Sequence, residues 1–117
     1  MIYRDIIETF NYEILYWRDF GVDQGDSFIL FKNQNRYGYL VIGWGSCIGC
    51  DMLKGCVSDK DYLDLAEKLY NQIRWGTASG TIKWIAEDSN DWYLYMDEFE
   101  GIFKEVTAII INDYKNE

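Results

Sequence analysis

The chain has 117 residues, which is the usual size of one globular domain, and we expect a single domain over residues 1–117. Apolar residues make up 49% of the chain and aromatic residues 18%, which provides a packed core and excludes a disordered chain. Twenty Asp and Glu against eleven Lys and Arg leave a net charge of −9. This charge disfavours direct binding to DNA, RNA or anionic lipid, because such binding needs basic side chains at the phosphates.

Histidine and proline are absent from the sequence. Without histidine, the chain alone cannot build a Ser-His-Asp or Cys-His nucleophilic site. No run approaches the ~20 apolar residues that span a bilayer. The first ten residues, MIYRDIIETF, contain acids and no long apolar stretch, so we expect no signal peptide. We therefore expect the protein in a reducing compartment, the cytosol, with its cysteines as thiols.

The first predicted element covers residues 2–17, whose apolar side chains recur at helical spacing. These residues are Ile6, Ile7, Phe10, Ile14 and Trp17. Gly21 is expected to end the helix. The β-branched and aromatic residues near Leu15 leave open a helix that runs into a short strand.

Two strands are predicted next, at Ser27–Lys32 and Tyr37–Trp44, after a turn at residues 22–26. The link NQNR favours a tight hairpin in which asparagine supplies the left-handed backbone. Both strands are apolar on both faces. The sheet should therefore be covered on both sides, or expose one aromatic face for binding.

A helix is predicted after Ser58, which is a strong N-cap with Asp61 at the capping-box position. Its apolar residues have helical spacing and are Tyr62, Leu65, Ala66, Leu69, Tyr70 and Ile73. Thr77 or Ser79 is expected to cap a shorter helix that carries Ile82, Ile85 and Ala86.

The C-terminal part predicts a short strand at Trp92–Met96 and a helix at Glu98–Tyr114. The expected order is α-β-β-α-α-β-α. The expected fold class is α+β, with a small, mainly antiparallel three-stranded sheet and about four helices.

The stretch GWGSCIGCDMLKGC, residues 43–56, contains every cysteine of the chain. Cys47 and Cys50 have the spacing of a zinc knuckle, with Cys56 and Asp51 as further candidate ligands, although a second knuckle is absent. The same pair could act as a dithiol switch, but no βαβ pattern precedes it. The structural alternative is a compact corner of buried small residues. Zinc is thus the one cofactor that the sequence suggests.

The segment RYGYLVIGWGSCIGCDML resembles a group of small phage and bacterial proteins that share a "YGxLxxGWGSCxGCDxL" core. The matching residues are 37–53, together with a "YQGD"-like turn at 23–26 and a helix end at 72–75, within roughly residues 20–97. The resemblance implies a mobile-element context. A member would be a small accessory protein that acts on host machinery.

Clusters of acids and an excess of aromatic residues are candidate contacts for a partner protein. Tyr and Trp are frequent interface anchors, and carboxylates on a rigid face can imitate DNA phosphates. The candidate contact residues are Asp23, Asp26, Tyr39, Glu87, Asp88, Asp91, Tyr93, Asp97 and Glu98. Tyr39 and Tyr93 are expected to be exposed on the sheet.

Two functions are consistent with these patterns. The first is a non-enzymatic phage accessory protein that binds and inhibits a basic host protein through an acidic, aromatic surface. An anti-CRISPR or other anti-defence inhibitor is the concrete version. The alternative is a metal-binding or thiol-redox protein centred on Cys47, Cys50 and Cys56. If the alternative function holds, cysteine substitutions would abolish activity. If the first function holds, reversal of the acidic charges would abolish binding to the partner.

Overall fold

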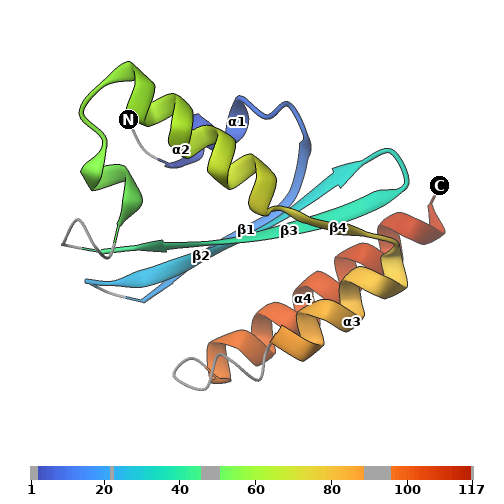
Figure 1. Ribbon diagram of the computed structural model, residues 1–117. Coiled ribbons are helices and arrows are strands. Elements are labelled where there is room, and N and C mark those ends of the chain that lie inside the picture. The colour runs from blue at the N-terminus through green and yellow to red at the C-terminus, as the bar shows by residue number, and fades with distance from the viewer. Residues whose placement is uncertain (1–2, 22, 46–50, 89–95, 117) are drawn as a thin grey trace.

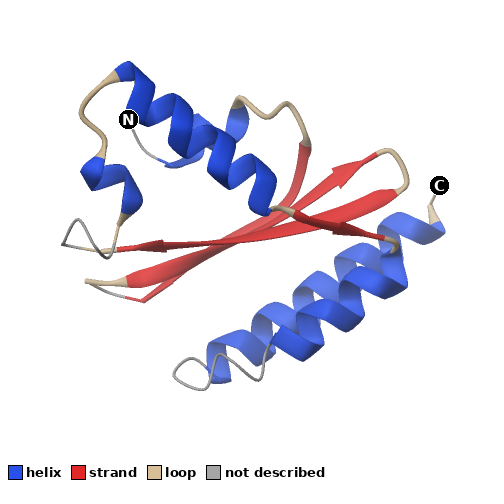
Figure 2. Ribbon diagram, viewed as in Figure 1, coloured by secondary structure: helices blue, strands red, loops and turns tan. Residues whose placement is uncertain are grey.

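A four-stranded antiparallel sheet lies between two layers of helices (Figures 1 and 2). The computed structural model describes residues 3–21, 23–45, 51–88 and 96–116. The strands are β1 (Glu13–Gly21), β2 (Gly25–Asn33), β3 (Arg36–Trp44) and β4 (Arg74–Gly76), in that order across the sheet. The helices are α1 (Tyr3–Glu8), α2 (Asp59–Gln72), α3 (Ala78–Asp88) and α4 (Met96–Lys115), with a 3₁₀ turn, η1, at Met52–Gly55.

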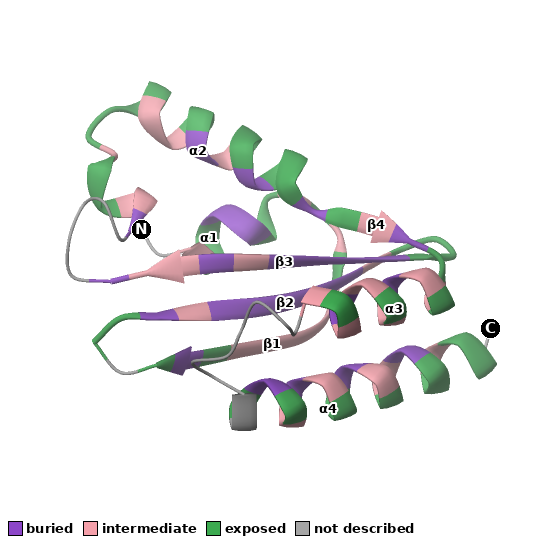
Figure 3. Ribbon diagram, turned by 60° about the horizontal axis from the view of Figure 1, so that its bottom comes forward, coloured by how far each residue is buried: buried purple, intermediate pink, exposed green. Residues whose placement is uncertain are grey.

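The helices cover both faces of the sheet, as expected for strands that are apolar on both sides. On the face covered by α1 and α2, the buried core includes Ile29, Phe31, Leu40 and Leu69. On the other face, α3 and α4 pack over a second core that includes Phe28, Leu30, Tyr37, Tyr39, Ile102 and Ile110. Figure 3 shows the buried residues running along β2 and β3 between these layers.

The N-terminal segment differs from the prediction, since the helix ends at Glu8 and residues 13–21 form β1. Asn11 has a φ of 60°, a left-handed backbone that turns the chain away from the helix. A bulge between Ile14 and Tyr16 then shifts the register of β1 against β2. Ile14 and Trp17 therefore share one face of the strand, and their spacing of three looks helical although the strand is extended.

The central hairpin is confirmed, with Asn33 paired to Arg36 across a two-residue turn. Gln34, not an asparagine, supplies the left-handed backbone, with a φ of 57°. Gly21, expected to stop a helix, instead closes the β1–β2 turn with a φ of 108°. A Cβ there would lie 2.3 Å from the carbonyl oxygen of Gln24, so the turn requires glycine.

The capped helices are also confirmed. The hydroxyl of Ser58 accepts from the Asp61 amide at 3.2 Å, and the Asp61 carboxylate accepts from the Ser58 amide at 3.2 Å. Thr77 caps α3 by accepting from the Gly80 amide at 3.1 Å. The last helix was predicted at Glu98–Tyr114 and covers Met96–Lys115.

The predicted sheet lacked β4, which has three residues and pairs with Tyr37–Tyr39 of β3. The sequence did not indicate β4 because the strand follows α2 directly, and three residues are too few to show the alternation of a strand. Residues 92–95 of the predicted third strand lie outside the described residues, and Met96 is the first residue of α4. Within the described residues, no helix has both the length and the apolar content to cross a membrane.

Candidate functional site

Only part of the cysteine stretch can be placed, because Cys47 and Cys50 lie outside the described residues. Cys56 is half-buried, and its thiol donates to the carbonyl oxygens of Met52 at 3.5 Å and Asp61 at 3.6 Å. Burial, together with the negative charge of Asp61, raises the pKa of the Cys56 thiol. These surroundings favour the protonated thiol over a metal-binding thiolate. The zinc and dithiol interpretations of Cys47 and Cys50 stay predictions.

Asp51, the proposed fourth ligand, is buried and already accepts several hydrogen bonds. Its carboxylate accepts from the Tyr3 hydroxyl, from the Gly45 amide at 3.2 Å and from the Leu53 amide at 3.1 Å. Burial and the bond to Asp51 raise the pKa of Tyr3. Asp51 thus caps η1 and ties it to α1. Among the described residues, no three His, Cys, Asp or Glu side chains lie close enough together to hold a metal ion.

Tyr39 and Asp88 form a structural contact rather than an exposed one. Tyr39 is only 6% exposed, because α3 and α4 cover its face of the sheet, so the expectation of an exposed Tyr39 was wrong. Its hydroxyl donates to Asp88, and burial with this bond raises the pKa of Tyr39 to about 12. Arg74 lies 3.7 Å from Asp88 and stacks over Trp84 at 4.2 Å. This network links β3 and β4 to α3.

The remaining described candidates lie toward one end of the molecule, which we call the acidic end and define as Asp23, Asp26, Glu87 and Glu98. Asp23 lies in the β1–β2 turn, and Asp26 is the second residue of β2. Glu87 lies in the last turn of α3, and Glu98 lies in the first turn of α4. Figures 1 and 3 show these three segments at the same end, away from the C-terminus. Within the described part of the chain, none of the four forms an ion pair.

The environments of these four carboxylates differ. Burial raises the pKa of Asp26, whereas Asp23, Glu87 and Glu98 are exposed. Glu98 lies near a helix N-terminus, where the helix dipole stabilises a negative charge. Glu87 lies at a helix C-terminus, where the dipole opposes it. Asp91 and Tyr93 lie outside the described residues, as does the side chain of Asp97.

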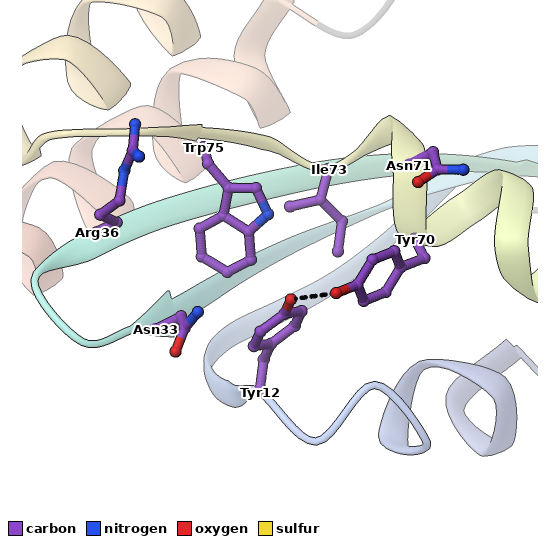
Figure 4. Close-up of a pocket in the computed structure, with 7 residues that line it drawn as sticks. All are labelled: Tyr12, Asn33, Arg36, Tyr70, Asn71, Ile73 and Trp75. Carbon is purple, nitrogen blue, oxygen red and sulfur yellow. Dashed lines mark hydrogen bonds between the residues drawn. The ribbon is translucent and has the colours of Figure 1, made fainter.

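At the opposite end, beside the β2–β3 hairpin, a cavity of about 410 Å³ opens on the face that carries α2 (Figure 4). We call it the aromatic pocket, and its lining residues are Tyr12, Asn33, Arg36, Tyr70, Asn71, Ile73 and Trp75. The hydroxyls of Tyr12 and Tyr70 are hydrogen-bonded at 2.8 Å, and their rings stack with centroids 5.9 Å apart. Trp75 meets Tyr12 edge to face at 4.8 Å.

The sequence analysis did not identify this pocket. Tyr70 was assigned to the apolar face of α2, yet it is 45% exposed. The available signal was the surplus of Trp and Tyr over what one core needs, but the sequence does not show which of them meet. Tyr12, Tyr70 and Trp75 come from a loop, a helix and a strand.

A second cavity, of about 380 Å³, lies between α1 and the other end of the same face, near Trp17 and Trp44. Its polar groups are already paired with one another. Arg4 stacks over Trp17 at 4.4 Å, and the Trp17 indole donates to Asp19 at 2.8 Å. Asp19 also accepts from the Ser27 hydroxyl. This cavity therefore offers a ligand less unused hydrogen-bonding capacity than the aromatic pocket.

Comparison of the chain with family models, curated proteins and solved structures found no match. The function is therefore argued from the acidic end, the aromatic pocket and the charge of the chain.

Proposed function

We propose that the protein is a non-enzymatic binding protein that docks its acidic end onto a basic surface of a partner protein. One observation carries this proposal. The four carboxylates belong to three separate segments that lie at one end of the molecule, and none of them forms an ion pair with a basic side chain of the described residues, although the charge of Arg18 attracts Glu98. Structural acids are usually paired or capping, as Asp113 and Asp61 are here. An unpaired group is free to meet a partner.

Electrostatics supports a basic partner. A net charge of −9 attracts positive surfaces and speeds their encounter, an effect that is strongest at low salt. Glu87 adds to this argument, because a carboxylate in the last turn of α3 opposes the helix dipole. A cation from a partner would offset that cost.

The resemblance to phage proteins favours a host protein as the partner, and an anti-CRISPR or other anti-defence inhibitor as the role. In this version the carboxylates occupy a basic groove that normally binds nucleic acid, as in a DNA mimic. Tyr39 and Asp88 are no longer part of the proposed contact, because they bind each other inside the fold.

The test compares two double variants with equal changes of charge. Asp23→Lys/Glu98→Lys alters the acidic end, and Glu13→Lys/Glu67→Lys alters exposed acids elsewhere. We expect immobilised native protein and the control to retain the same basic host protein, and the acidic-end variant to lose it. The retained partner should release its DNA when the native protein is added, and binding should weaken as salt rises.

Equal retention by both variants would contradict the assignment of the acidic end. If the host protein is retained but does not release its DNA, the protein is still a binding protein, and the proposal that it mimics DNA is contradicted.

A further inference from the structure

We propose that the aromatic pocket binds a small planar aromatic ring that carries an anionic group, such as a nucleoside monophosphate. This site does not depend on the acidic end, since the two lie at opposite ends of the sheet. Its volume, about 410 Å³, is in the range of small-ligand sites.

The pocket exists because α2 is shorter than the sheet that it covers. α2 ends at Gln72, whereas β2 and β3 continue to the hairpin. On the opposite face, α4 reaches that hairpin, where Lys32 and Tyr37 both contact Asp113. The sheet surface beyond α2 carries aromatic side chains, and no helix of the described residues lies over them (Figure 4).

The ring surfaces are held in place by packing. Trp75 lies against Gly38, where a Cβ would be only 2.7 Å from the indole. Tyr12 packs on Trp75 and on Phe31, with ring centroids 4.8 Å and 6.3 Å away. Tyr12 and Trp75 are both half-buried, so part of each ring remains accessible. Accessible rings of this kind stack on planar ligands at little entropic cost.

Arg36 contributes a positive charge to the pocket. Among the described residues it is the only charged one that lines the pocket, and the other polar side chains are Asn33, Asn71 and the two tyrosine hydroxyls. Other arginines of the described chain are engaged: Arg4 and Arg74 with an acid and a tryptophan, and Arg18 with Glu105. Arg36 forms no ion pair in the described residues. It would repel a cation at these rings, whereas it can donate to a phosphate or carboxylate.

The net charge of −9 does not exclude an anion here. Charges more than about 8 Å apart in water are largely screened at physiological salt, so the acids at the far end of the sheet contribute little at the pocket.

The experiment follows the indole N–H signal of Trp75 by NMR while adding AMP, adenosine, inorganic phosphate or indole-3-acetate. AMP and indole-3-acetate both combine a ring with an anion, and they distinguish phosphate from carboxylate. We expect at least one of them to shift this signal saturably at low-millimolar concentration, more tightly than adenosine or phosphate alone.

Arg36→Gln should raise the dissociation constant of that anion roughly tenfold and leave adenosine unchanged. Tyr70→Ala, at an exposed helical position, should raise both dissociation constants. The matched control, Lys104→Gln, removes an equal charge from α4 and should change neither.

Three results would overturn the proposal. They are the absence of saturable binding by both ring anions, equal effects of Arg36→Gln and Lys104→Gln, and equal affinity for AMP and adenosine. Loss of the acidic-end partner would not affect any of these outcomes.

Discussion

Gly38 shows at the scale of one residue how the sheet makes room for an aromatic side chain. A Cβ at this position would lie 2.7 Å from Cε3 of Trp75 and 2.8 Å from Cγ2 of Ile73. Both contacts are shorter than packed atoms tolerate, so any side chain must displace the neighbours.

We predict that Gly38→Ala destabilises the fold by about 1–3 kcal/mol, measured by urea unfolding. The matched control is Gly101→Ala in α4, where the new Cβ would lie at an ordinary contact distance of 3.6 Å from an Arg18 nitrogen. That variant should gain about 0.5–1 kcal/mol, because alanine is favoured inside a helix. Equal stability of the two variants would contradict the packing of Trp75 on Gly38.

Asp51 and Tyr39 show why residue type alone did not identify contacts. Both look like functional residues in the sequence, as a metal ligand and an interface anchor. In the fold Asp51 accepts bonds from Tyr3, Gly45 and Leu53, and Tyr39 donates to Asp88. Two of these partners, Tyr3 and Asp88, are more than 45 positions away in the chain from the residue that they contact.

At the scale of elements, α4 is fastened to the β2–β3 hairpin through Asp113. Its carboxylate accepts from Lys32 at 2.7 Å and from the buried Tyr37 hydroxyl at 2.5 Å. These bonds, that from Lys32 first, lower the pKa of Asp113. A carboxyl whose pKa is lower in the folded state stabilises the fold above its unfolded pKa, and that stabilisation is lost as pH falls.

We therefore predict that Asp113→Asn lowers stability by about 1 kcal/mol at neutral pH. The difference from the native protein should shrink as the pH drops below about 4, because the carboxyl of the unfolded chain then binds a proton more readily than the folded one does. Thermal unfolding of both proteins at several pH values between neutral and below 4 measures this difference in stability. Glu67→Gln, which removes an exposed acid, is the control and should run parallel to the native protein. A parallel curve for Asp113→Asn as well would exclude this linkage.

The short helix α1 and the strand β1 replace the single predicted helix over residues 2–17, for which a helix that runs into a short strand had been left open. The apolar residues from Ile6 to Trp17 suit one helical face, yet Asn11 breaks the segment and a bulge follows. Pairing of β1 with β2 decides between the two structures, and a local pattern does not contain that pairing.

At the scale of the whole molecule, one sheet serves two cores. Leu69 of α2 is fully buried in one and Ile110 of α4 in the other. Because β2 and β3 contribute side chains to both, neither helical layer has a sheet of its own.

We predict that Leu69→Ala and Ile110→Ala each cost about 2–5 kcal/mol and that each variant unfolds in one transition. Tryptophan fluorescence and far-ultraviolet circular dichroism should give coincident urea curves for both. Separate transitions in either variant would show that the two helical layers unfold independently.

The position of the four acids of the acidic end is also a property of the whole molecule. The clusters around Asp23 and Glu98 were visible in the sequence, and the fold places them at one end with Glu87. These acids lie at the same end because of the direction in which α3 and α4 run across the sheet. The aromatic pocket depends on the length of α2 relative to the strands.

The sequence by itself determined the elements whose signals are local. These are the capping box of α2, the Thr77 cap of α3, the central hairpin and the apolar face of α4. Caps, turns and helical periods act over a few neighbouring residues, so they can be recognised from the sequence. Only the tertiary structure decided β1, β4, the burial of Tyr39 and the pocket at Trp75. β1 depends on its pairing with β2, and the other three depend on contacts between segments far apart in the chain; no local pattern encodes either.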